Sequence, residues 1–367
     1  MTKSKNLIEL KAKMLCEGVN FTQSVEKLFM DQNPSNVKRG GLSSGGKMLL
    51  SNCLFVNAPF YKKRKVDLKV SIASSDSRNI IISQKNKELC RGKALTPPSW
   101  YKFNVNGFNI TQIVTVHNCQ LAISIYEDCA LFSKNIQCQF CVINKSLKNR
   151  SLVLIRKKPA LILSALKKIP VDQYGGLTIN GGMTFSDGRG IEFIQPVVEA
   201  VKRAYPKLQI AVEITPPKDL NWIDRLAASG VSSLMMNLEC WDEKVRAKLI
   251  PGKNKFCKRD LYIASFKRAI KKFGVGRVST CFVVGTEPIA SLKQGIEEVI
   301  KIGVIPSPLA GRYFEDIPNY PFAPTVNWKD FLEVLYFSKR LMDKVGIIST
   351  DKAGCVACGM CDLIKDA

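Results

Sequence analysis

The pattern of apolar and polar positions changes once along the chain, close to residue 118. Before that point, an amphipathic stretch over residues 5–30 predicts a helix, and a Gly/Ser-rich segment over residues 39–47 predicts a loop. Short β-like runs then continue to residue 116. We therefore expect residues 1–118 to form a separate N-terminal α+β module.

The rest of the chain alternates apolar runs with helical patterns of about 10–15 residues, which is typical of βα units around a parallel sheet. Strands are expected at residues 121–126, 176–180, 208–214, 233–239, 278–285 and 304–309, and helices at 159–169, 190–205, 220–230, 260–274 and 291–303. Six such units make a partial (β/α)6 TIM-type barrel rather than a closed eight-stranded one. The fold class is therefore α/β, with the barrel over 119–326 and a C-terminal helix and cysteine-rich segment over 327–367.

Composition adds a strong basic balance. Among 367 residues, 55 basic and 31 acidic side chains give a formal net charge of +24. Such a field favours an acidic partner, such as nucleic acid, an acidic carrier protein or a phosphorylated metabolite, although a solvated basic surface explains it equally well. No segment has the length and apolar content of a membrane span or a signal peptide, so we expect a cytoplasmic protein without a membrane partner.

Six of the thirteen cysteines fall in two tight groups, unlike the spread of cysteines in a secreted disulfide framework. Grouped thiols in a reducing compartment indicate a metal. His117 is the single histidine, and we expect it to have a structural or surface role. Any metal must then be held mainly by thiolates, which favours zinc or an iron-sulfur cluster.

The first group, Cys129, Cys138 and Cys141, follows the first expected barrel strand with the spacing C-x8-C-x2-C. Three thiolates in one loop can bind three irons of a 4Fe-4S cluster and leave the fourth iron open to an outside ligand. A zinc loop is the alternative, but no fourth ligand is evident nearby.

Polar or glycine-containing segments end the later strands, at the edge where a parallel barrel places its active site. Glu213 and Glu239 interrupt apolar runs there, and a buried carboxylate needs partners that a bound ligand can supply. The other segments at strand ends contain Gly181, Gly182 and Met183, then Asn237, and then Gly285. The segment Pro-Gly-Lys at residues 251–253 is interpreted as a turn.

These motifs resemble the radical S-adenosylmethionine (SAM) superfamily, and more closely the biotin-synthase-like radical SAM proteins of bacterial nitrilase gene clusters. The resemblance rests on RGG near Arg39, CQFC, NLECWDEKVRAKLIPGK, GRVSTCFVVGTEP and KAGCVACGMC, in that order over roughly residues 35–361. The superfamily usually has C-x3-C-x2-C, whereas that family shares the long first spacing found here.

The resemblance implies that Cys129, Cys138 and Cys141 bind a 4Fe-4S cluster whose open iron takes the amino acid end of SAM. The segment from Gly181 to Met183 would meet the methionine amino group through its backbone, with Met183 in place of the usual acid. The remaining cofactor contacts are expected from Phe140 beside the third cysteine, from Glu213, Asn237 and Glu239 toward the ribose and amino acid, and from Gly285 beside adenine.

The second group, Cys355, Cys358 and Cys361, has the dense spacing C-x2-C-x2-C that is typical of cluster-binding loops. A second 4Fe-4S cluster there can bind substrate, relay electrons or give up sulfide. A zinc loop is the alternative, and Cys119 and Cys53 are candidate fourth ligands.

We therefore expect an enzyme that reductively cleaves SAM and abstracts hydrogen from a small-molecule or acidic carrier-protein substrate, with a reducing electron donor. Sulfur insertion is the first expected outcome, and another radical transformation of a small metabolite is the alternative. No catalytic residue beyond the cofactor ligands is assigned. A zinc-containing nucleic-acid-binding protein is a third interpretation, which the lack of an aromatic and basic stacking platform disfavours.

Overall fold

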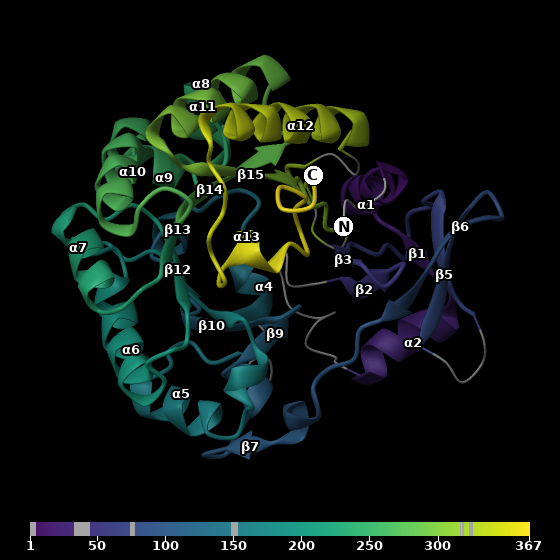
Figure 1. Ribbon diagram of the computed structural model, residues 1–367, viewed down its shortest axis with the longest axis horizontal. Helices are drawn as coiled ribbons and strands as arrows, with labels where there is room; N and C mark the ends of the chain where they lie inside the picture. Colours follow the sequence, from purple (N-terminus) through teal and green to yellow (C-terminus); the bar gives the residue numbers. More distant parts are fainter. Residues whose placement is uncertain are drawn as a thin grey trace.

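The computed structural model describes residues 5–32, 45–73, 78–147, 153–315, 317, 319–322 and 326–367. The RGG segment at residues 39–41 lies outside them. Figure 1 shows a curled sheet with helices around its outer side and a smaller sheet beside it. The fold is mixed α/β.

The curled sheet has seven strands in the order β15-β14-β13-β12-β11-β10-β9. Its strands are β9 (Thr115–His117), β10 (Gln120–Tyr126), β11 (Gly176–Gly181), β12 (Ile210–Ile214), β13 (Ser233–Met236), β14 (Val278–Val284) and β15 (Ile305–Ala310). Strands β10 to β15 pair in parallel and lie close to the six expected positions. Strand β9 precedes residue 118 but pairs antiparallel with β10, so the expected module boundary falls within a continuous sheet.

Most helices that follow these strands lie on the outer side of the sheet, whereas the short helix at Ile143–Leu147 is drawn near the centre of the view (Figure 1). The helices are α4 (Ile143–Leu147), α5 (Pro159–Leu166), α6 (Ile191–Ala204), α7 (Asn221–Ala228), α8 (Glu243–Leu249), α9 (Pro251–Phe256), α10 (Arg259–Phe273), α11 (Ile289–Ile302) and α12 (Trp328–Val345). In α6, the buried residues Ile194, Val197, Val198 and Val201 recur at helical spacing, so one face of the helix is apolar. Within the described residues, no helix combines the length and apolar content needed to cross a bilayer.

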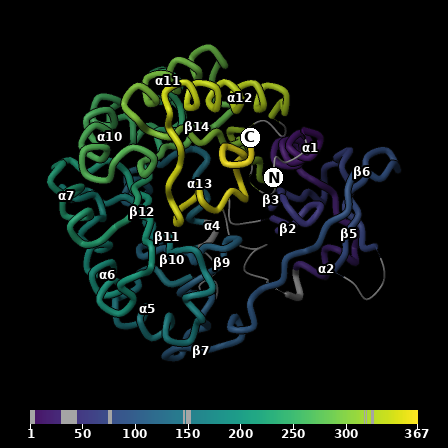
Figure 2. Tube along the Cα trace, in the orientation of Figure 1, coloured from purple at the N-terminus to yellow at the C-terminus, as the bar shows by residue number. Residues whose placement is uncertain are grey.

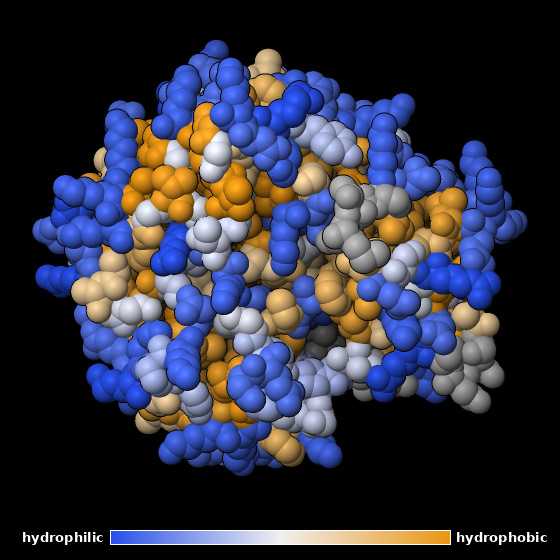
Figure 3. Space-filling model, viewed as in Figure 1, coloured by the Kyte–Doolittle hydropathy of each residue, from blue (hydrophilic) through white to orange (hydrophobic). Residues whose placement is uncertain are grey.

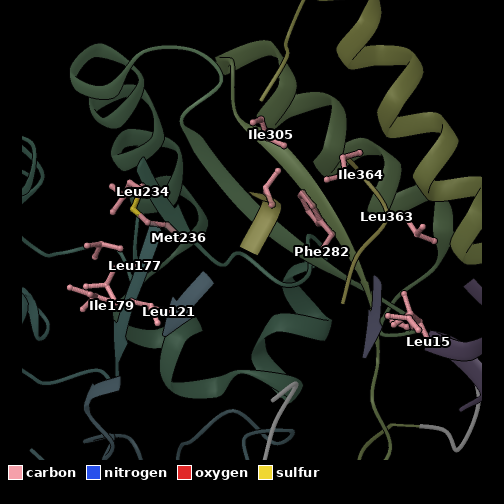
Figure 4. Packing of buried hydrophobic residues seen from close by; sticks show 14 of the residues in the cluster. Leu15, Leu121, Leu177, Ile179, Leu234, Met236, Phe282, Ile305, Leu363 and Ile364 are labelled. Atoms are coloured by element: carbon pink, nitrogen blue, oxygen red, sulfur yellow. The ribbon is translucent and has the colours of Figure 1, made fainter. Parts of the chain in front are cut away.

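Alternation along the strands separates the core from the site. Leu177 and Ile179 of β11 belong to the buried apolar core, as Leu234 and Met236 of β13 do (Figure 4). Asn180, on the opposite face of β11, lines a cavity inside the curl. The inner face therefore presents polar side chains to the interior of the half-barrel.

The N-terminal module is a six-stranded sheet in the order β1-β4-β5-β6-β2-β3 with two helices and a β7-β8 hairpin. Its elements are α1 (Lys5–Glu17), β1 (Asn20–Phe21), α2 (Gln23–Gln32), β2 (Gly46–Leu50), β3 (Leu54–Ala58), β4 (Leu68–Ile72), β5 (Asn79–Gln84), β6 (Lys87–Ala94), β7 (Asn104–Val105) and β8 (Phe108–Asn109).

The prediction of a single helix over residues 5–30 is wrong, because the first helix ends before Gly18. Gly18 has φ +77°, and a Cβ there would lie 2.4 Å from the Tyr61 ring. This left-handed conformation ends α1 and lets β1 pair with β4.

The C-terminal segment, with α13 (Cys355–Cys358), lies against the N-terminal module; Figure 2 shows the two ends of the chain close together beside α1. Lys11 of α1 donates to Asp366 Oδ2 at 2.8 Å, and the backbone amide of Asn57 donates to the Met360 carbonyl at 3.0 Å. Leu363 and Ile364 join the apolar core (Figure 4). The cysteine-rich tail is thus packed into the protein.

Hydrophilic residues dominate the outline of the face in Figure 3.

Candidate active site

A cavity of about 450 Å³ opens at the carboxyl ends of β10 to β13, and this volume is typical of small-ligand sites. Its wall includes the first cysteine group and most of the residues predicted to contact SAM. They are Cys129, Cys138, Phe140, Cys141, Gly181, Gly182, Met183, Glu213, Asn237 and Glu239. The fold therefore brings these predicted residues together, although they span more than a hundred positions of the chain.

Gly285 is the predicted residue that does not line this cavity. It ends β14 with φ +95°, and a Cβ there would lie 3.0 Å from the Val326 side chain. That conformation and the contact with the segment before α12 explain why a glycine occupies this position.

The three cysteines of the first group belong to one loop that leaves the end of β10. Cys138 is 8% exposed, and the Cys141 amide donates to the Cys138 carbonyl at 3.0 Å in a tight turn. Phe140 lies between them and stacks on Phe322, with ring centroids 5.3 Å apart. The loop is therefore fixed by packing and by its own turn.

Gly182 holds the start of this loop by close backbone contact. A Cβ on Gly182 would lie 1.5 Å from the Asp128 carbonyl oxygen, so only glycine fits there. The Gly182 amide donates to the Tyr126 carbonyl and the Ala130 amide donates to the Met183 carbonyl, both at 2.8 Å. The glycine segment after β11 is thus the platform for the cysteine loop.

A buried ion pair anchors the same loop from the other side. Lys157 Nζ lies 2.8 Å from Glu127 Oε1 and donates to the Ser124 carbonyl at 2.7 Å. Both side chains are almost fully buried, so each needs its partner. This pair fixes Glu127 two residues before the first cysteine, and the sequence pattern did not indicate it.

Sequence reasoning also missed Lys253, because the turn expected at residues 251–253 is wrong. Pro251 instead occupies the first position of α9, where a proline is well tolerated. Lys253 Nζ then lies 2.9 Å from Glu239 Oε1 in the cavity wall. Burial alone would lower the pKa of Lys253. The carboxylate of Glu239 raises this pKa by more than burial lowers it, so the pKa of Lys253 lies well above its usual value. Proline is common at the first position of a helix, so Pro251 was the available signal in the sequence.

The oxygen atoms in the cavity wall fit a polar ligand bound beside an iron-sulfur cluster. Five buried oxygen atoms in this wall have no hydrogen-bond partner: Gln137 Oε1, Glu213 Oε1, Thr215 Oγ1, Asn237 Oδ1 and Glu239 Oε2. Buried polar atoms are normally satisfied, so a ligand with several N–H and O–H donors is the natural partner. SAM has such donors on its amino group, ribose and adenine.

The Cys138 and Cys141 thiols carry protons when no metal is bound. Burial raises the pKa of Cys138 well above its usual value and raises the pKa of Cys141 to about 11, so a metal must displace these protons. Among the described residues, no group of three or more His, Cys, Asp or Glu side chains converges to hold a single metal ion. Cluster cysteines each bind a separate iron, so a cluster asks for no such convergence.

The tail cysteines open onto a second cavity of about 280 Å³. Cys355, Cys358 and Cys361 all line it, and burial is the first cause that raises the pKa of the Cys358 and Cys361 thiols. The two cavities share part of their walls. The shared residues are Ser124, Glu127, Asn180, Glu213 and Asn237.

Neighbours of the tail loop come from distant parts of the chain. The Cys358 thiol donates to the His117 carbonyl at 3.4 Å, and the His117 residue lines the second cavity. The side-chain amide nitrogen of Asn57 lies 3.8 Å from Cys361 Sγ. Neither Cys119 nor Cys53 lines either cavity, but Cys119 is close enough to raise the pKa of the Cys358 thiol. Cys119 is therefore the better placed of the two candidate fourth ligands.

Comparison with known proteins gives partial matches. No protein-family model matches the chain. A bacteriochlorophyllide c C-7(1)-hydroxylase of Chlorobaculum limnaeum is 29% identical over 153 residues, which are 40% of this chain and 37% of that protein. The match thus spans little more than a third of the relative's length.

Solved radical SAM enzymes are among the similar structures. A radical SAM methyltransferase from Sphaerobacter thermophilus has 14% identity and a TM-score of 0.46, covering 77% of this chain and 76% of that one. Coproporphyrinogen III oxidase (HemN) from Escherichia coli has 15% identity and a TM-score of 0.40, covering 57% and 50%. In this chain the loop of Cys129, Cys138 and Cys141 opens onto a polar cavity at the carboxyl edge of the parallel strands, where the motifs predict a cofactor site.

Proposed function

We propose that this protein cleaves SAM reductively and uses the product radical to abstract hydrogen from a small molecule held between the two cysteine groups. The observation that carries the proposal is the shared wall of the two cavities, because the same five residues line the cavity of the Cys129 loop and the cavity of the Cys355 loop. Cys129, Cys138 and Cys141 would hold a 4Fe-4S cluster that would supply the electron for splitting SAM into methionine and a 5'-deoxyadenosyl radical, and hydrogen abstraction from the substrate would follow.

The chain's own residues bind and orient the cofactor in this proposal. Glu239 accepts from Lys253 with one oxygen and presents the other, unpartnered oxygen to the cavity. Asn237 presents a further unpartnered oxygen in the same cavity, whereas Glu213 lies in the wall that this cavity shares with the smaller one. These acceptors suit the ribose hydroxyls and amino group of SAM.

The tail loop is proposed to hold a second 4Fe-4S cluster through Cys355, Cys358 and Cys361. Sulfur insertion, the outcome expected from the motifs, would place a cluster sulfide and the substrate carbon in the same 280 Å³ cavity. Hydroxylation is a second candidate because the Chlorobaculum relative is named as a hydroxylase. It requires the carbon radical to pass one further electron to an oxidised one-electron acceptor, for which the proposed tail cluster is the candidate, and to gain the oxygen of water with release of a proton.

Anaerobic reconstitution tests the two-cluster proposal. We expect about eight irons per chain and two distinguishable 4Fe-4S signals in electron paramagnetic resonance. Replacing Cys355, Cys358 and Cys361 with Ala should remove one signal, whereas replacing Cys53 and Cys90, which line neither cavity, should remove none. Zinc in place of iron in the purified protein would reject the proposal.

A further inference from the structure

The smaller cavity carries acidic groups in a protein that is otherwise basic. Glu127, Glu213 and Asp362 line it, and the described lining residues include no lysine or arginine, although the chain has a net charge of +24. Any molecule between the two cysteine groups therefore meets carboxylates rather than the basic surface.

Asp362 is the most informative of these acids. It is 2% exposed; its Oδ2 accepts from Ser307 Oγ at 2.8 Å, and its Oδ1 has no hydrogen-bond partner. Leaving a buried acceptor unsatisfied is unfavourable, so a bound donor is expected at this oxygen.

The other two acids differ in how their charge is matched. Glu127 pairs with Lys157 at 2.8 Å. Glu213 hydrogen-bonds Cys355 and Asn180 and keeps Oε1 unpartnered, and no described lysine or arginine forms a salt bridge with it. Together with Asp362, it gives the cavity two carboxylates without a paired cation.

Two cations lie behind the tail loop, and Lys11 is close enough to lower the pKa of Asp362 against the effect of burial. Lys11 Nζ is 2.8 Å from Asp366 and also donates to the Gly359 carbonyl. Arg312 donates to the Asn57 carbonyl at 2.7 Å. Neither side chain lines the cavity.

We infer that the substrate is a small organic cation that presents N–H donors, such as a primary ammonium group, to Asp362 and Glu213. This deepens the proposed function and rests on it, because it names the substrate class of the same interior site. The volume of about 280 Å³ suits a small molecule. Phosphorylated metabolites and acidic carrier proteins, which the net charge suggested, would meet like charges in this cavity and are disfavoured.

The test uses anaerobically reconstituted holoenzyme and three probes of equal chain length: n-butylamine, n-butanol and n-butyrate. Binding is measured from broadening of each probe's methyl proton signal by the reduced protein, since a probe beside a paramagnetic cluster relaxes faster. We expect butylamine to bind at least tenfold more tightly than butyrate.

Asp362→Asn, which keeps the shape and removes the charge, should weaken butylamine at least tenfold, and Glu213→Gln should weaken it in the same direction. Asp343→Asn removes one acid from the exposed end of α12 and should change nothing. If Asp362→Asn fails to load iron, Glu213→Gln decides the test. Equal or tighter binding of butyrate, or butylamine binding that neither variant weakens, would overturn the inference.

SAM cleavage measured on the same samples separates this inference from the proposed function. A protein that binds butylamine but never cleaves SAM would reject the function and keep the acidic site. A protein that cleaves SAM but prefers butyrate would keep the function and reject the substrate class.

Discussion

Lys253 Nζ and Glu239 Oε1 lie 2.9 Å apart in the wall of the larger cavity, joining the start of α9 to the end of β13. Glu239 has φ +73°, a left-handed conformation that is uncommon for a residue other than glycine. The Glu239 amide donates to the Cys281 carbonyl at 2.9 Å, which keeps this residue tied to β14. The ion pair and the backbone together aim the free oxygen of Glu239 at the cavity.

Lys253→Met should leave Glu239 as an uncompensated buried charge. Breaking such a pair typically costs about 3–5 kcal/mol of stability, and we expect the melting temperature to fall accordingly. SAM affinity should fall about ten- to a hundredfold, as for the loss of one charged hydrogen bond. Calorimetric titration of the reconstituted protein measures the affinity.

Two further variants complete that test. Glu239→Gln combined with Lys253→Met should restore much of the stability without restoring SAM binding. Lys248→Met, at an exposed position of α8, should alter neither quantity. SAM affinity unchanged in Lys253→Met would assign the pair a purely structural role.

Gly182→Ala should displace the cysteine loop, because its Cβ would lie 1.5 Å from the Asp128 carbonyl oxygen. We expect loss of about half of the iron, since one of two clusters would not form. Gly181→Ala is the matched control: its Cβ would meet Tyr126 at 3.5 Å, an ordinary contact, and iron content should be unchanged. If Gly182→Ala kept as much iron as Gly181→Ala and the wild type, the glycine segment would not support the loop.

These cases show which features the sequence could predict. The six parallel strands were predictable because their apolar runs and alternation are local. Gly18, Lys253 and Asp362 were not assigned correctly, since their roles depend on Tyr61, Glu239 and Ser307, which lie 14 to 55 positions away. The joining of the two cavities likewise depends on how the tail packs back into the half-barrel.

The tail cysteines should separate functionally from the first loop. Replacing Cys355, Cys358 and Cys361 with Ala should leave SAM cleavage intact and stop product formation, because the radical arises at the other loop. If sulfide is donated, labelled sulfide in the reconstitution must reach the product, whereas hydroxylation would instead take label from ¹⁸O-water. Normal product formation by the triple variant would assign the tail cluster a structural role.

Asp351 should make stability depend on pH. Burial raises its pKa from 3.8 to about 7, so the folded state binds a proton more readily than the unfolded state does. The stability gained from the protonated form is present at low pH and is lost as pH rises from about 4 to 7. Between pH 5.5 and 7.5, the melting temperature of the wild type should fall relative to that of Asp351→Asn; parallel curves for the two proteins would contradict the assignment.

Formation of 5'-deoxyadenosine from SAM and dithionite is the most direct test of the account. The reconstituted wild type should form it, and the variant with Cys129, Cys138 and Cys141 replaced by Ala should form none while keeping the tail cluster's iron. The control with Cys53 and Cys90 replaced should match the wild type. Cleavage of SAM by the first triple variant at the wild-type rate would contradict the assignment of this loop as the radical-generating site.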